Sequence, residues 1–101
     1  MIPQVNVGDY GTEFLFAFFA NGAPVDISDA SLLQMTMRRP DGSQVVANLA
    51  PVTDGKDGLA YYVVAYGDLS ETGQYQIQGV VQTPSGQWST DIKKLNVLPN
   101  L

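Results

Sequence analysis

The sequence predicts an all-β protein, a sandwich of about seven or eight antiparallel strands. Turn-forming pairs such as Asn21-Gly22 and Asp57-Gly58 recur at short intervals and leave little room for a long helix. The runs between them are rich in Val, Ile, Tyr, Phe and Thr, and several alternate apolar and polar residues with a period of two. The length of 101 residues suits one domain over 1–101 with a single ordinary core.

The first predicted strands lie near the start of the chain. Residues Gln4–Val7 place two valines on one face, as in a short strand. The run Thr12–Ala20 is apolar on both faces, because three phenylalanines alternate with Leu15, Ala17 and Phe19. Such a strand is either central in its sheet or has an outer face that meets another protein. We expect one of these two arrangements here.

A β-hairpin is predicted in the middle of the chain. Apolar and polar residues alternate in Ser31–Arg39 and again in Gln44–Leu49. The four residues between these runs read Pro-Asp-Gly-Ser. Proline fixes φ, aspartate bonds to nearby amides and glycine accepts a positive φ, so this order is typical of a tight turn. We expect an antiparallel pair closed by Pro40, Asp41 and Gly42.

Three further runs complete the predicted strands. Gly58–Tyr66 is apolar on both faces, whereas Gln74–Gln82 has apolar residues on one face and four glutamines on the other. The apolar period of Gln87–Val97 shifts part-way along, which predicts a β-bulge near Lys93-Lys94 or a change of sheet. The alternation along all strands predicts a core that contains Phe16, Leu33, Met35, Val63, Tyr75, Ile77 and Trp88.

The start of the penultimate strand resembles a corner found in immunoglobulin-like domains. Gly73 and Tyr75 match its Gly-x-Tyr pattern, in which the tyrosine hydroxyl bonds to the backbone upstream. Ile77 stands where a disulfide-bonded domain of this type has cysteine. With about seven strands at this spacing, an immunoglobulin-like sandwich is the leading architecture. One helical turn is also expected in Gly67–Thr72, capped by Asp68 or Ser70.

Composition excludes many functions. The chain has no cysteine and no histidine, so it has no disulfide framework, no zinc site of the usual ligands, no thiol nucleophile and no histidine relay. Its net charge of −5 disfavours binding to nucleic acid. The most apolar run, Phe14–Ala20, is far shorter than the ~20 residues that span a bilayer, and no basic segment precedes it as in a signal peptide. We expect a protein without enzyme activity that binds no cofactor, no membrane and no small-molecule substrate. We also expect it to be made and folded in the cytoplasm.

The positions of the acidic residues indicate that they stabilise turns rather than form a catalytic or metal-binding site. Five aspartates stand beside glycine or proline, where a short carboxylate bonds to nearby amides: Asp9, Asp41, Asp54, Asp57 and Asp68. The segment Asp54–Gly58 has a superficial likeness to a calcium loop. Its third position is Lys56, however, and no glutamate follows before Glu71, so we expect a glycine-rich hairpin loop.

Two kinds of binding surface remain open. The first is a protein interface, for which the candidates are the outward residues of the apolar run, the glutamine face and the apolar end of the chain: Leu15, Phe19, Gln74, Gln76, Gln78, Leu98 and Leu101. The alternative is a carbohydrate-binding platform built from exposed rings among Tyr61, Tyr62, Tyr66 and Trp88. In alternating strands about half of these rings point into the core, so the protein interface is the stronger hypothesis.

The order of the turn signatures resembles a known family. The segments that carry the resemblance are Gly8-Asp9-Tyr10-Gly11-Thr12, Asn21–Ser28, Arg39–Ser43, Asp57–Tyr62, Gly67-Asp68-Leu69 and Thr72–Gly79. In this order they are similar to small structural proteins of tailed bacteriophages. The nearest likeness is the N-terminal domain of the baseplate upper protein of phages that infect Gram-positive bacteria. The resemblance covers roughly Gly8 to Val97.

That resemblance implies an immunoglobulin-like sandwich that attaches receptor-binding or fibre parts to the particle, without catalytic residues. The implied partners are other virion proteins and further copies of the chain, and the implied location is the virion, after synthesis in the cytoplasm of the bacterial host. Capsid decoration, the head-to-tail joint and a tail or baseplate adaptor are all compatible with it.

Overall fold

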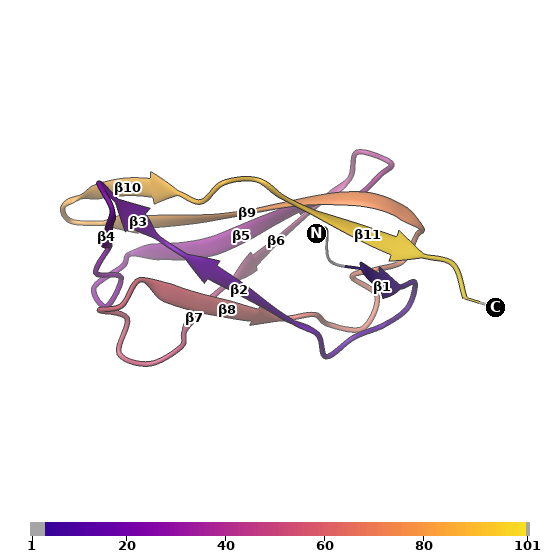
Figure 1. Ribbon diagram of the computed structural model, residues 1–101, viewed down its shortest axis with the longest axis horizontal. Coiled ribbons are helices and arrows are strands. Elements are labelled where there is room, and N and C mark those ends of the chain that lie inside the picture. Colours follow the sequence, from indigo (N-terminus) through magenta and orange to yellow (C-terminus); the bar gives the residue numbers. More distant parts are fainter. Residues whose placement is uncertain (1–3, 101) are drawn as a thin grey trace.

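The computed structural model describes residues 4–100, and this part of the chain contains eleven strands and no helix (Figure 1). The molecule is elongated, with extents of 46 × 24 × 20 Å. The absence of helix from these residues confirms the all-β prediction, but the expected number of about seven or eight strands is too low. The predicted runs Thr12–Ala20 and Gln87–Val97 each divide into two strands, and Ala23–Pro24 and Ala50–Pro51 form additional strands of two residues. The strands are β1 (Gln4–Asn6), β2 (Glu13–Ala17), β3 (Phe19–Ala20), β4 (Ala23–Pro24), β5 (Leu32–Arg38), β6 (Gln44–Asn48), β7 (Ala50–Pro51), β8 (Leu59–Val63), β9 (Gly73–Thr83), β10 (Gly86–Ser89) and β11 (Lys93–Leu98).

The larger sheet has the strand order β1-β11-β9-β5-β6, and β10 pairs with the far end of β9. The β5–β6 hairpin and the long β9 lie where the sequence predicts them. The expectation of purely antiparallel strands is wrong at one place, because β1 runs parallel to β11 with Val5 opposite Val97. Pairing with a strand from the other end of the chain leaves no local turn signal that the sequence can show.

The smaller sheet has the order β2-β8-β7, and β3 forms a separate two-stranded sheet with β4. The long apolar run thus divides after Ala17, because the Asn21-Gly22 turn folds β3 back on β4. Both turn residues have positive φ, 54° for Asn21 and 79° for Gly22, as in the tight turns that close two-residue hairpins. The expectation of a central strand is wrong: β2 lies at the edge of its sheet.

The core lies between the two larger sheets. Phe16 and Ala60 from the smaller sheet join Met35, Tyr75 and Ile77 from the larger sheet in one buried cluster. Of the predicted core, Phe16, Met35, Tyr75 and Ile77 are buried, and Leu33 and Trp88 are half-buried and pack against the cluster.

The prediction for Val63 is wrong, because this side chain is 46% exposed. In β8 and just beyond it, Ala60, Tyr62 and Val64 face the core instead. Both faces of this run are apolar, so alternation alone does not tell which of them is buried.

The predicted β-bulge is present between β10 and β11. Ser89 pairs with Val80 and Lys93 with Ile77, so the three residues 90–92 lie opposite only two residues of β9. Thr90 holds the irregular backbone in place: its N–H donates to the Gly79 carbonyl at 2.9 Å, and its hydroxyl accepts from the Gly79 N–H at 2.9 Å. The shift in apolar period therefore marks a bulge within one sheet rather than a change of sheet.

The turn between β5 and β6 has the predicted chemistry. The Arg39 N–H donates to the Ser43 carbonyl at 2.8 Å, and Gly42 has φ 89°. The Asp41 carboxylate accepts from both the backbone N–H and the hydroxyl of Ser43, which lowers the pKa of Asp41. The Asp41 N–H in turn donates to the Glu71 carboxylate at 2.8 Å, which ties the hairpin to the segment before β9.

The residues predicted as a helical turn, Gly67–Thr72, form turns and no helix. The Asp68 carboxylate caps a turn instead, because it accepts the Ala65 N–H at 2.9 Å and also the Tyr62 hydroxyl. Burial, followed by the nearby Asp68, raises the pKa of Tyr62 from 10.0 to about 12. Because the pKa of Tyr62 is higher in the folded protein than in the unfolded chain, its neutral hydroxyl contributes to the free energy of unfolding. This contribution is complete below pH 10 and is lost as the pH rises through about 12.

The Tyr75 hydroxyl makes the backbone bond that the sequence predicts. It donates to the Glu71 carbonyl at 2.8 Å and accepts from the Glu71 N–H at 3.1 Å, and the ring is fully buried. We expect Tyr75→Phe to lower the free energy of unfolding by about 1 kcal/mol, because the Glu71 groups lose this partner. Urea unfolding of both proteins measures the difference, and equal midpoints would contradict a stabilising role of the corner.

Candidate interaction surfaces

The outer face of the smaller sheet is apolar. Leu15, Tyr61 and Ala50 form one row across its three strands, since Leu15 pairs with Tyr61 and Tyr61 with Ala50. The neighbouring rows join Ala17 to Leu59 and Glu13 to Val63. We call this surface the apolar face and define it by Leu15, Ala17, Ala50, Leu59, Tyr61 and Val63.

The apolar face is open to solvent in the described part of the chain. The side chain of Leu15 is 50% exposed and that of Val63 is 46% exposed, although both residues are apolar and lie in paired strands. Glu13, at the rim, is the one charged residue in the three rows of residues 4–100 that form it. Contiguous apolar surface of this kind is typical of protein interaction sites. The sequence indicates Leu15 as an interface residue but assigns Tyr61 to the carbohydrate alternative and Val63 to the core. The signal for their place on this surface was the second apolar face of Gly58–Tyr66.

The outer face of the larger sheet is polar and slightly basic. One row runs across four strands from Lys94 through Gln76 and Arg38 to Gln44. A second row joins Gln78 to Thr36 and Thr36 to Val46. On the other side of the first row, Gln74 pairs with Asn96. We call this surface the glutamine face and define it by Thr36, Arg38, Gln44, Val46, Gln74, Gln76, Gln78, Lys94 and Asn96.

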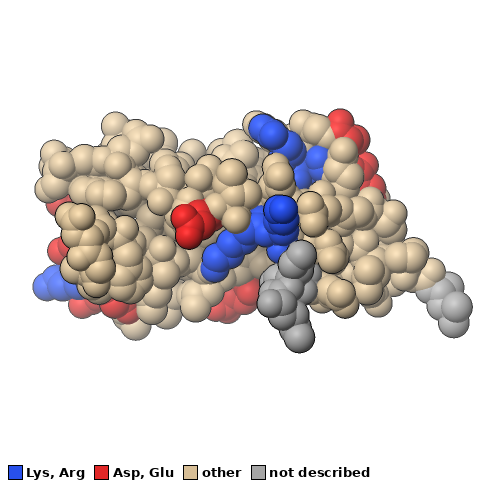
Figure 2. Space-filling view, turned by 45° about the horizontal axis from the view of Figure 1, so that its top comes forward, with Lys and Arg blue, Asp and Glu red and all other residues tan. Residues whose placement is uncertain are grey.

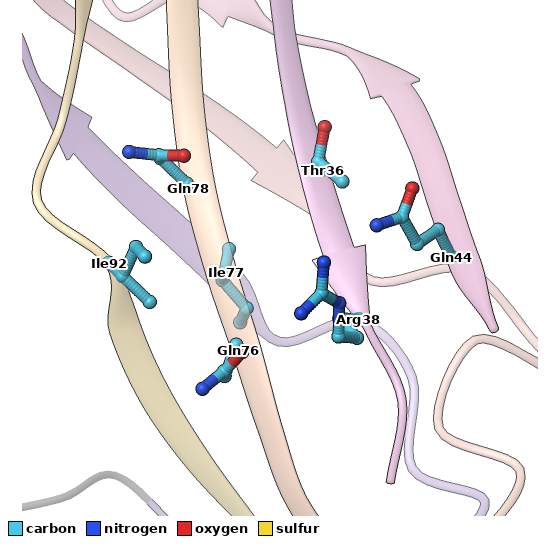
Figure 3. A pocket seen from close by; sticks show the side chains of 7 residues that line it. All are labelled: Thr36, Arg38, Gln44, Gln76, Ile77, Gln78 and Ile92. Carbon is cyan, nitrogen blue, oxygen red and sulfur yellow. The ribbon is translucent and has the colours of Figure 1, made fainter. Parts of the chain in front are cut away.

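A shallow hollow of about 90 Å³ lies on the glutamine face, and Figure 3 shows the side chains that line it. They come from β5, β6 and β9, together with Ile92 just before β11. Sites for small molecules have volumes of roughly 300–1,000 Å³, so this hollow is too small to enclose one. Gln78 is also held in place, because its side-chain amide donates to the Thr90 carbonyl at 2.9 Å.

The cations of this acidic chain are unevenly distributed. Lys93 and Lys94 begin β11, and Arg38 lies one strand beyond β9 in the same row as Lys94. Figure 2 shows most of the Lys and Arg side chains near the middle of the view and one at its left border, with acidic side chains beside the central group and toward the borders. The larger sheet therefore presents a locally basic surface on a chain with a net charge of −5.

The predicted interface residues do not form one surface. Leu15 lies on the apolar face, whereas Gln74, Gln76 and Gln78 lie on the opposite side of the sandwich. Phe19 is 53% exposed but belongs to the small β3–β4 sheet. Leu98 is exposed at the end of β11, and Leu101 lies outside the described residues.

The aspartates predicted to cap turns do so. Each accepts a backbone N–H: Asp9 from Asn6, Asp41 from Ser43, Asp54 from Lys56, Asp57 from Leu59 and Asp68 from Ala65. The segment 54–58 is part of the loop that connects the antiparallel strands β7 and β8, as predicted. Within residues 4–100 no group of three or more acidic side chains is placed to hold a metal ion.

The aromatic rings are spread over several sites. Tyr61 lies on the apolar face, Tyr62 packs against the core and Trp88 is half-buried. The exposed rings of Tyr10 and Tyr66 contact each other with centroids 5.8 Å apart, but their planes meet at 77°. This edge-to-face pair does not form the flat platform on which a sugar ring stacks.

The described residues include no helix long and apolar enough to cross a membrane. Comparison of the chain with protein-family models and with curated protein sequences finds no match in either case.

Proposed function

We propose that this protein is a structural component of a tailed-phage particle and that it acts by binding other proteins through its apolar face. The observation that carries this proposal is the set of apolar rows on β2, β8 and β7 that no described part of the chain covers. In a particle built from many copies, modest contacts of this kind become firm through multivalency. The order of turn signatures along the chain supports the phage assignment.

We also propose an immunoglobulin-like topology. In such domains two sheets face each other, and the strand that begins at the tyrosine corner is central in one of them. Here β9 begins beside Tyr75 and lies between β11 and β5, while β2, β8 and β7 form the facing sheet. This strand order, with β6 added beyond β5, corresponds to the variable type of the fold.

Two faces of unlike chemistry on opposite sides suit a connecting role. The apolar face fits a permanent contact, because obligate interfaces are more apolar than transient ones. The glutamine face offers amide donors and acceptors with two cations, and it fits a more polar neighbour. Capsid decoration, a head-to-tail joint and a baseplate adaptor each require contacts with neighbours of this kind.

The geometry favours protein binding over the carbohydrate alternative. A sugar platform needs exposed rings that share a plane, whereas Tyr10 and Tyr66 are edge-to-face. Trp88 does line an open hollow of about 320 Å³ together with Asp26 and Asp29. Because Trp88 is the only tryptophan in the chain, its fluorescence distinguishes the two functions. Protein binding predicts no change with oligosaccharides, and a saturable change would favour the alternative.

Quantitative mass spectrometry of purified particles tests the proposal. We expect the protein in multiple stoichiometric copies per particle, and Val63→Lys is expected to reduce incorporation because it places a charge in the apolar face. Val46→Lys is the matched control, since Val46 is also an exposed strand valine but lies on the glutamine face. Presence in infected cells and absence from particles would refute the phage assignment, and equal incorporation of both variants would refute the role of the apolar face.

A further inference from the structure

The outer edge of β2 has backbone groups without a strand partner. Within residues 4–100, β8 is the only strand that pairs with β2. The Val64 N–H donates to the Thr12 carbonyl and the Phe18 N–H donates to the Gly58 carbonyl. In an antiparallel pair, residues that bond to the partner alternate with residues that point away. The backbone N–H and C=O groups of Glu13, Leu15 and Ala17 therefore point away from β8, toward the open edge.

A groove of about 350 Å³ runs along this edge between the two sheets. Its floor is apolar, with Phe14 and Phe16 from β2 facing Leu95 from β11 and Val5 from β1. Neighbouring strands lie about 4.8 Å apart, so a strand added beside β2 places every second side chain over this groove. The edge thus combines free hydrogen-bonding groups with an apolar floor, the two features used in recognition by strand addition.

The charges beside the groove are mainly positive. Lys93 and Lys94 line it on the β11 side, and Glu13 is the acidic residue on the β2 side. The Lys93 ammonium donates to the outward carbonyl of Leu15 at 3.4 Å, so a described side chain occupies part of the edge. Edge lysines of this kind discourage unspecific strand pairing. An acidic side chain on an incoming strand compensates for the displaced contact, because it gives Lys93 a new partner.

We propose that β2 is the docking edge for an extended segment of another protein, which pairs with Glu13, Leu15 and Ala17 and carries an acidic side chain two residues from an apolar one. The apolar side chain lies over Phe14 and the acidic one meets Lys93. This goes beyond the proposed function, because it uses the backbone edge and the groove rather than the side chains of the apolar face. A second copy of this chain is the less favoured occupant, since its net charge of −5 opposes self-association.

Amide hydrogen exchange with a synthetic peptide tests this inference on the full chain. The probe is the blocked heptapeptide Thr-Val-Thr-Glu-Thr-Val-Thr, whose palindromic order fits either strand direction. We expect it to slow exchange at Glu13, Leu15 and Ala17, and to bind more tightly than the same peptide with lysine in place of glutamate. Lys93→Glu is expected to reverse this preference, because it changes the sign of the charge that contacts the Leu15 carbonyl at the groove.

Leu15→Pro removes the central outward N–H, and Leu15→Ala is the matched control that shortens the side chain but keeps the donor. Proline is tolerated at such an edge position, where its nitrogen faces away from the partner strand. We expect Leu15→Pro to bind the peptide at least about tenfold more weakly than Leu15→Ala. Ala17→Pro repeats the experiment if Leu15→Pro does not fold, as judged by circular dichroism.

Three results would overturn the inference. One is an absence of protection on β2 at saturating peptide. Another is that the peptide protects β6, an edge strand of the larger sheet, instead of β2. The third is concentration-dependent protection of β2 without peptide, which identifies a second copy as the occupant. None of these measurements involves Val63, so their failure is distinguishable from a failure of the apolar face in particle assembly.

Discussion

Replacing Phe16 by alanine is expected to lower the free energy of unfolding by about 3–5 kcal/mol. The Phe16 side chain is 1% exposed and reaches across the core from β2. It lies so close to Gly79 of β9 that a Cβ atom at position 79 would be 3.0 Å from the ring. Phe16→Ala removes this contact between the two sheets and leaves a cavity that the paired strands cannot close. Urea unfolding followed by circular dichroism measures the loss.

Phe19→Ala is the matched control for Phe16→Ala. It removes the same atoms three residues later, but Phe19 is 53% exposed and belongs to the β3–β4 sheet. We expect a change within about 0.5 kcal/mol. Similar losses in the two variants would show that the apolar run does not have one buried and one open face.

Features of the fold with a local cause were predictable from the sequence. The β5–β6 hairpin follows from the chemistry of Pro40, Asp41 and Gly42, whose bonds are made within the turn itself. The bulge before β11 follows from a shift in apolar period that any continuous strand would lack. The glutamine face follows from strict alternation along β9, where the buried and exposed sides differ clearly in polarity.

Features that depend on distant parts of the chain were not predictable. The edge position of β2 is a property of sheet order, and an apolar strand has the same pattern at an edge as in the centre. The outward direction of Val63 depends on which apolar face of β8 meets the larger sheet. The helical turn at Gly67–Thr72 does not form, because Asp68 bonds to the Ala65 N–H and to the Tyr62 hydroxyl.

The candidate site was predictable in part for the same reason. Leu15 and Gln74 are exposed strand residues, as the sequence suggests, and Gln76 and Gln78 are half-buried on the same face as Gln74. The separation of Leu15 from the glutamines onto opposite sides of the sandwich follows from the pairing of whole sheets. The docking edge of β2 consists of backbone groups, which no side-chain pattern reports. Sequence alone therefore indicates which residues are free to bind, whereas the fold decides which of them act together.

The second large loss of stability is expected on substitution of Gly58, which lies immediately before β8. Its φ of +74° lies in the left-handed region that favours glycine. A Cβ atom there would be 2.6 Å from the Phe18 carbonyl oxygen and 3.1 Å from that of Val25. The Phe18 N–H also donates to the Gly58 carbonyl at 2.9 Å, so the two backbones cannot separate without loss of this bond. Backbone strain and overpacking each cost about 1–3 kcal/mol, so Gly58→Ala is expected to lower the free energy of unfolding by about 2–6 kcal/mol.

Gly67→Ala separates the two causes in this estimate. Gly67 has a φ of +91°, in the same region as Gly58, but an added Cβ would meet nothing within 4 Å. Its substitution adds strain without a steric clash, and we expect a loss of about 1–2 kcal/mol. Parallel thermal and urea unfolding of both variants measures the difference. Equal losses in Gly58→Ala and Gly67→Ala would show that the close approach of Gly58 to the Phe18 carbonyl has no energetic role. The backbone where β2, β3 and β8 meet would then be able to move apart and accommodate the added Cβ despite its hydrogen bond.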